Sequence, residues 1–434
     1  MAAPTRQSRD TTATRRRMRA LDSLRDSPGF RRLWLSNLCF FGGVWTQTLI
    51  LGWMVFDSTG SEFLLALFTA VRLAPMLLGP FAGVLSDRFN RLKLLNVACG
   101  WAFGAVAVLA LLATLDLAPY PVLLAGGLII GLAQSPSQPA RHSIVIELVG
   151  RENLSNANAW NAMAMNMMQV IGPAIGGAMI SAVGGPVSLW VSASWYGLSL
   201  LVLRPLRGVG QIRAEHTESA FRMLAGGFRE ILRNRLAASA LFVTLVANIL
   251  IWPIYQSFMP VFAEKQLHLD AAGLGALLTC AGVGGLIGSV IIAALGDFRF
   301  KGGLFVIGTA AWGALWAVFA LAHRPGVAFP VMAAIGLASA AFGVLQTTLL
   351  LMAAPSHVQG RALGLQELAI GVMPVSSLLL GVAAQTVGVG ATTFVCGIAL
   401  VVILAGLSLG VPQLLRYSGT DTGEPVARTA EAAG

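Results

Sequence analysis

Residues 83–93 read GVLSDRFNRLK, a short polar stretch that joins two apolar runs, each long enough to cross a bilayer as a helix. Gly83 allows two helices to approach closely at the turn. The carboxylate of Asp87 can accept hydrogen bonds from a helix N-terminus, where the helix dipole favours an anion. Arg88 and Arg91 can form ion pairs on the same side. The stretch therefore predicts a charged turn between two membrane-spanning helices.

The two flanking runs belong to a series that extends through the chain. Of the 434 residues, 56% are hydrophobic and only 11% are charged, whereas soluble domains have about 25% charged residues. This composition excludes a soluble enzyme, a disordered chain and a disulfide scaffold, and it predicts an all-α polytopic membrane protein. The twelve apolar runs, in two sets of six, cover residues 33–56, 62–86, 93–115, 120–140, 158–183, 186–204, 236–262, 271–296, 303–322, 326–352, 363–386 and 390–411.

The positive charges alternate with these runs. If the N-terminus is cytoplasmic, the segments on the cytoplasmic side contain 26 of the 29 Lys and Arg residues, counting Arg141 and Arg151 between the fourth and fifth runs. The outer loops contain only Lys265 and Arg324, and Arg72 lies inside the second run. Lys and Arg accumulate in cytoplasmic loops of membrane proteins. The charges therefore predict a multi-pass protein of the inner (plasma) membrane with both termini cytoplasmic, and they explain the net charge of +10 without a nucleic-acid partner.

The same series predicts the domain organisation. A basic cytoplasmic tail is expected at residues 1–32, and a first bundle of six helices at 33–204. A cytoplasmic linker at 205–235 leads to a second six-helix bundle at 236–412, and a cytoplasmic tail follows at 413–434. Two such halves are typical of duplicated transporters, whose binding sites lie near the bilayer midplane between the halves.

The stretch at 83–93 resembles the signature of the loop between helices 2 and 3 in the major facilitator superfamily, G-x-x-x-D-R-x-G-R-[RK]-[RK]. It departs from that signature at Asn90 and Leu92. The resemblance implies a fold of two pseudo-symmetric six-helix bundles and a charged cluster that closes the inner side of the transporter, with Asp87 against the start of helix 11. An ordinary solvated loop is the alternative. The residues assigned to this inner gate are Gly83, Asp87, Arg88, Arg91 and Arg361.

Residues 172–177 read GPAIGG and resemble the core of the superfamily's antiporter motif, which is associated with exporters. Pro173 frees a backbone carbonyl and permits a kink, while glycines allow close helix contact. Ordinary packing of small residues is the alternative. The gating residues expected here are Gly172, Pro173, Gly176 and Gly177.

Further segments resemble the bacterial branch of enterobactin exporter-like and macrolide-efflux-like transporters, and this resemblance extends over residues 25–412. The segments are DSTGS at 57–61, RLAP at 72–75, PAR at 139–141, LVGRENLSNAN at 148–158 and GRALG at 360–364.

Ionisable groups inside a membrane are costly, and most are functional. Arg72 is expected either to contact substrate or to hold helices 2 and 11 together. Glu367 is the best-placed carboxylate for proton coupling, with an interfacial pair as the alternative. We expect Asp57 and Glu62, at the outer helix ends, to be solvated. The resemblance implies a central cavity lined by helices 1, 4, 7 and 10, whose expected substrate or proton-pathway residues are Gln47, Gln134, Asn248, Tyr255, Gln256 and Gln346.

These residues predict a proton-coupled exporter of an amphipathic small molecule, such as a drug or siderophore-like compound, that works as a monomer in the bilayer by alternating access. An importer or symporter on the same fold is the first alternative. A membrane-embedded transferase is the second, but the five histidines are scattered and form no catalytic or metal-binding pattern. We expect no cofactor and no bound metal.

Overall fold

A computed structural model describes residues 27–78, 90–135, 137–150, 154–206, 231, 233–295, 298–354 and 358–418 of the chain. We call the described residues up to 206 the first half and those from 231 onward the second half. The helices of the first half are α3 (Pro28–Thr59), α4 (Glu62–Leu73) with the 3-10 turn η1 (Ala74–Leu78), α6 (Arg91–Thr114), α7 (Tyr120–Gln134), α8 (Ser137–Val149), α9 (Leu154–Val183) and α10 (Gly185–Leu203).

The second half repeats this all-helical pattern. Its first rod begins with the α-helix α12, which ends at Leu250, and beyond Pro253 it contains two π-helical turns separated by a short α-helical turn. Proline removes a backbone donor from a helix and so disrupts its regular hydrogen bonds. The elements are α12 (Arg235–Leu250), η2 (Ile254–Phe258), α13 (Met259–Val261), η3 (Phe262–Gln266), α14 (Ala271–Leu295), α15 (Lys301–Ala320), α16 (Pro325–Ala353), α17 (Gln359–Gly371), α18 (Met373–Val387), α19 (Val389–Gly410) and α20 (Pro412–Arg416).

The described helices join into twelve rods that follow the order of the twelve apolar runs. Ten helices in the described residues are long and apolar enough to cross a membrane. The other two rods are formed by α7 with α8 and by α4 with η1. The predicted polytopic all-α fold is therefore confirmed, and the protein is a multi-pass membrane protein.

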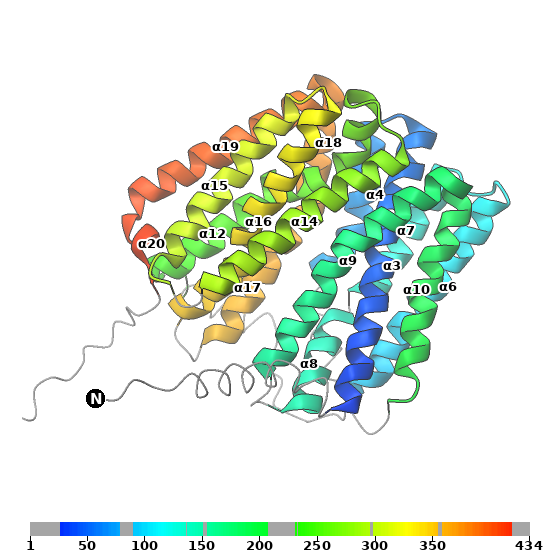
Figure 1. Cartoon of the computed structure of the whole chain (residues 1–434), viewed down its shortest axis with the longest axis horizontal. Helices are drawn as coiled ribbons and strands as arrows, with labels where there is room; N and C mark the ends of the chain where they lie inside the picture. Colours follow the sequence, from blue (N-terminus) through cyan, green and yellow to red (C-terminus); the bar gives the residue numbers. More distant parts are fainter. Residues whose placement is uncertain are drawn as a thin grey trace, which may run out of the picture.

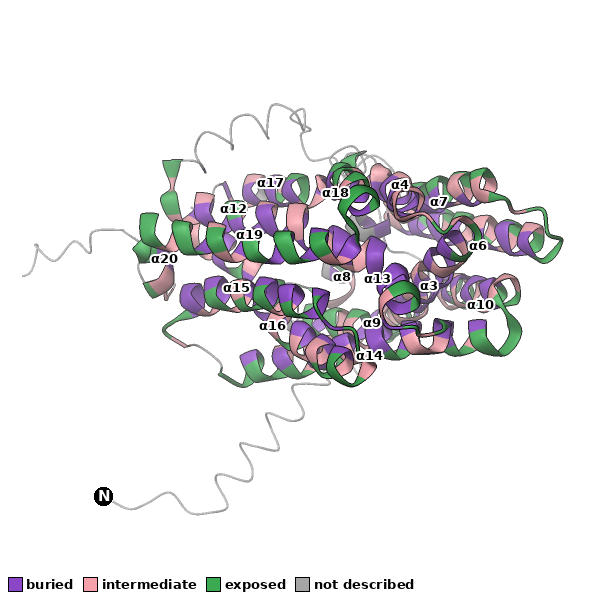
Figure 2. Cartoon of the chain, turned by 90° about the horizontal axis from the view of Figure 1, so that it is seen from above, coloured by how far each residue is buried: buried purple, intermediate pink, exposed green. Residues whose placement is uncertain are grey.

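Large apolar side chains cover the outward faces of the helices. Figure 2 shows exposed residues along the outer side of α19 and buried residues on the sides that face other helices. Leu379, Val395 and Leu409 are among the most exposed, and Leu409 is 85% exposed. An apolar surface of this extent suits contact with lipid tails rather than water.

The two halves meet mainly along two helix pairs. Helix α9 of the first half packs against α14 of the second, and α4 packs against α18. Figure 1 shows α9 and α14 side by side where the halves meet, and it shows that α3 starts at the lower edge of the molecule. We call the upper end in this view, which contains the α3–α4 and α9–α10 connections, the outer end.

Candidate functional site

The connection between α3 and α4 is a sharp corner at the outer end. Gly60 ends α3 in the left-handed conformation, with φ of 60°, which glycine adopts without steric cost. Ser61 begins α4, and its hydroxyl accepts a hydrogen bond from the backbone N–H of Leu64 at 3.3 Å. This corner turns the Gly60 carbonyl and the first residues of α4 towards the second half.

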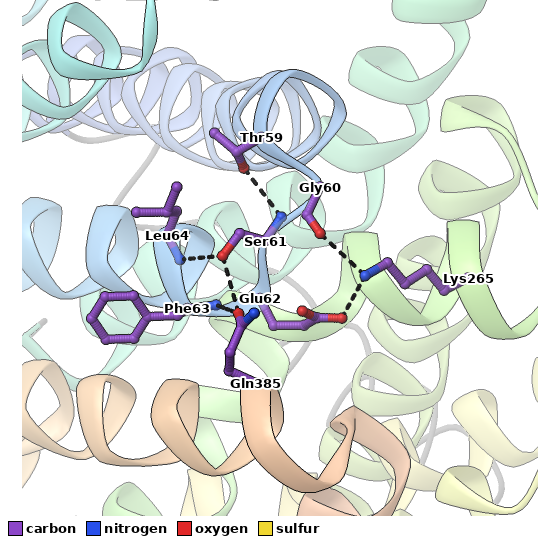
Figure 3. Close-up of polar contacts among 8 residues, drawn as sticks. All are labelled: Thr59, Gly60, Ser61, Glu62, Phe63, Leu64, Lys265 and Gln385. Atoms are coloured by element: carbon purple, nitrogen blue, oxygen red, sulfur yellow. Dashed lines mark hydrogen bonds and ion pairs between the residues drawn. The ribbon is translucent and has the colours of Figure 1, made fainter.

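Lys265, from η3 of the second half, binds this corner (Figure 3). Its Nζ lies 2.6 Å from Oε1 of Glu62 and donates to the carbonyl of Gly60 at 3.1 Å. The ammonium also lies 5.2 Å from the centre of the Phe56 ring, within the range of a cation–π contact. Glu62 is 13% exposed. The expectation that Glu62 is solvated is therefore wrong, because an ion pair with a residue 203 positions away covers its carboxylate.

Gln385, on α18, forms a second link to the same corner (Figure 3). Its Oε1 accepts hydrogen bonds from the Ser61 hydroxyl at 3.1 Å and from the backbone N–H of Phe63 at 3.2 Å. One amide side chain thus satisfies an N-terminal N–H of α4, which has no partner within its own helix. The link joins α18 of the second half to α4 of the first.

A third link joins α9 to the start of α14. The Ser181 hydroxyl donates to Oδ2 of Asp270 at 3.2 Å and accepts from the backbone N–H of Ala272 at 3.1 Å. Asp270 also accepts from the N–H of Gly273 at 2.9 Å, as a helix cap does. We call the side chains of these three links, Ser61, Glu62, Lys265, Gln385, Ser181 and Asp270, the outer latch.

Below the outer latch, the glycines at 172–177 contact two different helices. A Cβ added at Gly172 would lie 2.6 Å from Cβ of Trp45 on α3. A Cβ added at Gly177 would lie 2.5 Å from the carbonyl oxygen of Ala271 on α14, and one at Gly275 would lie 2.5 Å from the carbonyl oxygen of Pro173. Helices α9 and α14 therefore touch backbone to backbone across the two halves.

Gly176 and Pro173 complete this segment. Gly176 faces the backbone of Thr46 on α3, where an added Cβ would lie 3.3 Å from the carbonyl oxygen. Pro173 is buried inside α9.

A chain of polar side chains crosses the interior of the first half. Nε2 of Gln134 donates to the Tyr196 hydroxyl at 2.9 Å, and that hydroxyl donates to Oε1 of Gln47 at 2.9 Å. Nε2 of Gln47 is buried without a partner. Two of the predicted pathway residues are thus brought together by Tyr196, which the sequence analysis did not identify.

Two arginines are buried in the same half. Arg72 is 4% exposed and donates from Nη1 to the hydroxyl of Thr48 at 3.2 Å. Arg141 is 2% exposed; it donates to Oδ1 of Asn37 and to Sγ of Cys99, and its guanidinium lies 4.2 Å from the centre of the Phe40 ring. Arg141 was counted in the segment between the fourth and fifth runs, whereas the structure places it inside α8, with partners on α3 and α6.

The predicted pathway residues of the second half are less connected. Tyr255 shares a side-chain hydrogen bond with Gln169 of α9 and a ring contact with Trp252. Asn248 donates to the carbonyl of Thr244 in its own helix at 2.8 Å. Oε1 of Gln346 is buried without a partner, and Gln256 is half-buried.

Glu367 is exposed on α17, four residues before Gly371. Residues four apart lie on the same face of a helix, and a Cβ at Gly371 would lie 3.8 Å from Cδ2 of Leu77 in η1. Glu367 therefore lies on the side of α17 that faces the first half.

The predicted inner gate is described only in part. Gly83, Asp87 and Arg88 lie outside the described residues. Arg91 begins α6, and Arg361 is half-buried near the start of α17. Within the part of the chain that the structure describes, no group of three or more His, Cys, Asp or Glu side chains could hold a metal ion.

Residues 20–421 match the model of the transmembrane secretion effector family. The chain belongs to this family of major facilitator superfamily transporters. The transporter is 25% identical over 376 residues to the multidrug efflux pump Tap of Mycolicibacterium fortuitum, covering 83% of this chain and 90% of that protein. It is 21% identical over 372 residues to the staphyloferrin A transporter of Staphylococcus aureus, covering 85% and 92%.

Solved structures share the fold of the transporter. A peptide transporter POT structure aligns with a TM-score of 0.76 and 14% identity, covering 90% of this chain and 95% of that chain. A nucleoside transporter NupG structure aligns with a TM-score of 0.68 and 12% identity, covering 90% and 100%. The family and the fold identify a membrane transporter rather than an enzyme, so the alternative of a membrane-embedded transferase is set aside.

Breaking the ion pair of the outer latch is expected to shift the transporter modestly towards states that are open at the outer end. Because Lys265 is 48% exposed, solvent screens the pair, and such pairs contribute about 0.2–1 kcal/mol. Glu62→Gln should raise the outer-open fraction about 1.4-fold to fivefold. Electron–electron resonance distances between spin labels on the outer ends of α9 and α14 measure this fraction.

The exchanged double variant Glu62→Lys with Lys265→Glu serves as the rescue, and Asp57→Asn, at an exposed carboxylate on the same side, serves as the matched control. If Glu62→Gln leaves the distance distribution unchanged at low salt, the ion pair does not hold the outer end closed.

Proposed function

We propose that the transporter exports an amphipathic small molecule across the plasma membrane in exchange for protons, by alternating access and as a monomer. The observation that carries this proposal is the distribution of contacts between the halves. Among the described residues, the outer latch joins the halves at the outer end of the rods, and the hydrogen bonds of Thr279 with Val170 and of Tyr255 with Gln169 join them nearer the middle of α9. A transporter closed on this side takes up its cargo from the opposite side.

The charge distribution supports the proposed direction of transport. With both termini in the cytoplasm, 26 Lys and Arg residues lie on the cytoplasmic side, as the positive-inside rule requires. The outer latch then faces the periplasm or the cell exterior, and the inner side is the one open to cargo. The multidrug efflux pump and the staphyloferrin A transporter among the relatives support transport of a small organic molecule, and the efflux pump supports export.

The mechanism follows from a shift between two populations. A ligand can change a conformational equilibrium only through its different affinity for the two states. Protons and cargo would therefore favour opposite orientations of the halves, with α9–α14 and α4–α18 as the contacts that close and open.

The test uses proteoliposomes with an imposed pH gradient and a fluorescent amphipathic dye as cargo. We expect the dye to accumulate on the acidic side, as proton exchange requires, and to stop when an ionophore collapses the gradient. Accumulation that ignores the ionophore would contradict proton coupling, and movement of dye together with the proton would indicate an importer or symporter.

Asp87→Asn is expected to lower transport about tenfold or more, because the loss of a charged hydrogen bond costs about 1.5–3 kcal/mol. Asp87 lies outside the described residues, and its role comes from the sequence pattern at 83–93. Dye transport is normalised to the amount of protein in the membrane.

Asp116→Asn, which changes a carboxylate at an exposed outer loop, is the control for Asp87→Asn. Normal transport by Asp87→Asn would remove Asp87 from the inner gate.

A further inference from the structure

We propose that the exported molecule carries an anionic group, such as a carboxylate, that binds to Arg72 in the first half of the transporter. This inference rests on the proposed function and adds a charge to the cargo. It follows from an excess of buried hydrogen-bond donors over acceptors around Arg72, in the membrane-spanning part of the first half.

Arg72 supplies most of this excess. A guanidinium has five N–H donors, and the hydrogen bond from Nη1 to Thr48 is the one that the described residues form with it. That hydroxyl already donates to the carbonyl of Val44 at 2.7 Å, so Thr48 provides a dipole but no charge. Arg72 also has no ion pair with any described carboxylate. An anion would satisfy both the free donors and the charge.

Gln47 has another donor without a partner, but this donor is as fully enclosed as Nε of Arg141. Gln47 precedes Thr48 in α3, and its side chain is 0% exposed. Its oxygen accepts from Tyr196, while its Nε2 group has no partner. A buried amide without a partner is costly. Because its oxygen is already occupied, Gln47 lacks an acceptor, as Arg72 does, so this half has more buried donors than acceptors.

Arg141 provides the contrast within the same half. It is held by Asn37, Cys99 and the face of Phe40, and its remaining Nε is fully enclosed. The unpaired nitrogens of Arg72 are not among the fully enclosed atoms. Arg141 is therefore built into the packing of the half, whereas Arg72 keeps donors that a ligand can reach.

The location of Arg72 suits a group that is bound and released. It lies in the last turn of α4, and α4 packs against α18 and η2 of the second half. The next element, η1, approaches Gly371 of α17. A movement of one half against the other therefore changes the surroundings of Arg72, and with them its affinity for an anion.

The test measures binding of two dyes that share a xanthene ring system, anionic carboxyfluorescein and cationic tetramethylrhodamine methyl ester, to the full-length transporter in nanodiscs. Fluorescence anisotropy should show tighter binding of carboxyfluorescein. Arg72→Gln should weaken that binding about tenfold or more, as expected for the loss of a charged hydrogen bond, and should leave the cationic dye unaffected. Arg72→Lys should retain part of the affinity, and Arg324→Gln, at an exposed outer position, is the matched control.

A fold tolerates the removal of an unpaired buried charge better than the introduction of one. Arg72→Gln should therefore remain folded, and its thermal unfolding transition checks this. Equal affinity for the two dyes, or an Arg72→Gln variant that binds carboxyfluorescein as the native chain does, would overturn the inference.

A titration of chloride against bound carboxyfluorescein distinguishes a site for an organic cargo anion from a site for an inorganic anion. If millimolar chloride displaces carboxyfluorescein, the site at Arg72 binds inorganic anions and the inference of a cargo site is overturned. If carboxyfluorescein stays bound, the result supports a cargo site.

Transport of the same two dyes in proteoliposomes distinguishes a failure of this inference from a failure of the proposed function. If the cationic dye is transported and carboxyfluorescein is neither bound nor transported, the transporter remains an exporter and the anionic cargo is wrong. If carboxyfluorescein binds through Arg72 but a pH gradient moves neither dye, the anion site stands and proton-driven export is wrong.

Discussion

Glu367→Gln is expected to abolish dye accumulation driven by a pH gradient, lowering it about tenfold or more, while downhill exchange of dye continues. Glu367 lies on the face of α17 that is turned towards the first half, and it has no ion pair with a described residue. The elements packed against α17 are α12, α16 and η1, and their sequences contain one charged residue, Arg235 at the start of α12. An ionised carboxylate in such surroundings is costly once water is excluded.

Under the proposed exchange with protons, this cost would couple protonation to movement of the halves. When the inner side closes and removes water from Glu367, the neutral acid becomes the favoured form, and when that side opens the proton can leave. A glutamine resembles the neutral acid permanently, so the halves can still exchange cargo but no proton is carried. The coupling is lost, although the pathway remains.

Two measurements separate loss of coupling from loss of folding. Counterflow of dye without a gradient should stay within about twofold of the native rate, because the pathway is intact. Glu264→Gln, at an exposed carboxylate of the outer end, should retain gradient-driven accumulation. If Glu367→Gln accumulates dye normally under the gradient, another group carries the proton.

The membrane-spanning elements could be predicted from the sequence because the length of an apolar run determines whether it can cross a bilayer. The run at 271–296 became α14 (Ala271–Leu295), and the run at 390–411 became α19 (Val389–Gly410). The fourth run was predicted too short. Its polar residues near Arg141 lower the local hydropathy, but Asn37 and Cys99 satisfy the arginine inside the fold. A hydropathy pattern does not record such partners.

The candidate site was predictable only where a residue type is informative by itself. Arg72 stood out because an arginine within an apolar run is rare, and the structure places it at a donor-rich position. The outer latch could not be predicted, because Glu62 and Lys265 are ordinary loop-end residues until the fold brings them together. Tyr196 was missed because it lies outside the four helices expected to line the cavity, although it joins Gln47 to Gln134.

Gly177→Leu is expected to prevent closure of the outer end and to reduce transport about fivefold or more, since overpacking a tight contact costs about 1–3 kcal/mol. A Cβ at this position would lie 2.5 Å from the carbonyl oxygen of Ala271 and 2.9 Å from Cα of Gly275. Both are backbone atoms and cannot turn aside as a side chain can. Since α14 belongs to the other half, the clash is relieved by separating the halves.

The outer latch makes this separation measurable. With Ser181→Cys and Ala272→Cys introduced on opposite sides of a 3.1 Å contact, an oxidant should cross-link the native chain rapidly and the Gly177→Leu chain slowly. Gly177→Ala should give an intermediate result, because it adds one carbon at the same place. Gly343→Leu, on an exposed face of α16 with nothing within 4 Å of the added Cβ, controls for the general effect of a leucine in a membrane helix. Rapid cross-linking together with normal transport in Gly177→Leu would mean that the α9–α14 contact is not required for the closed state. Slow cross-linking with impaired transport would identify the GPAIGG segment as the surface on which the two halves close.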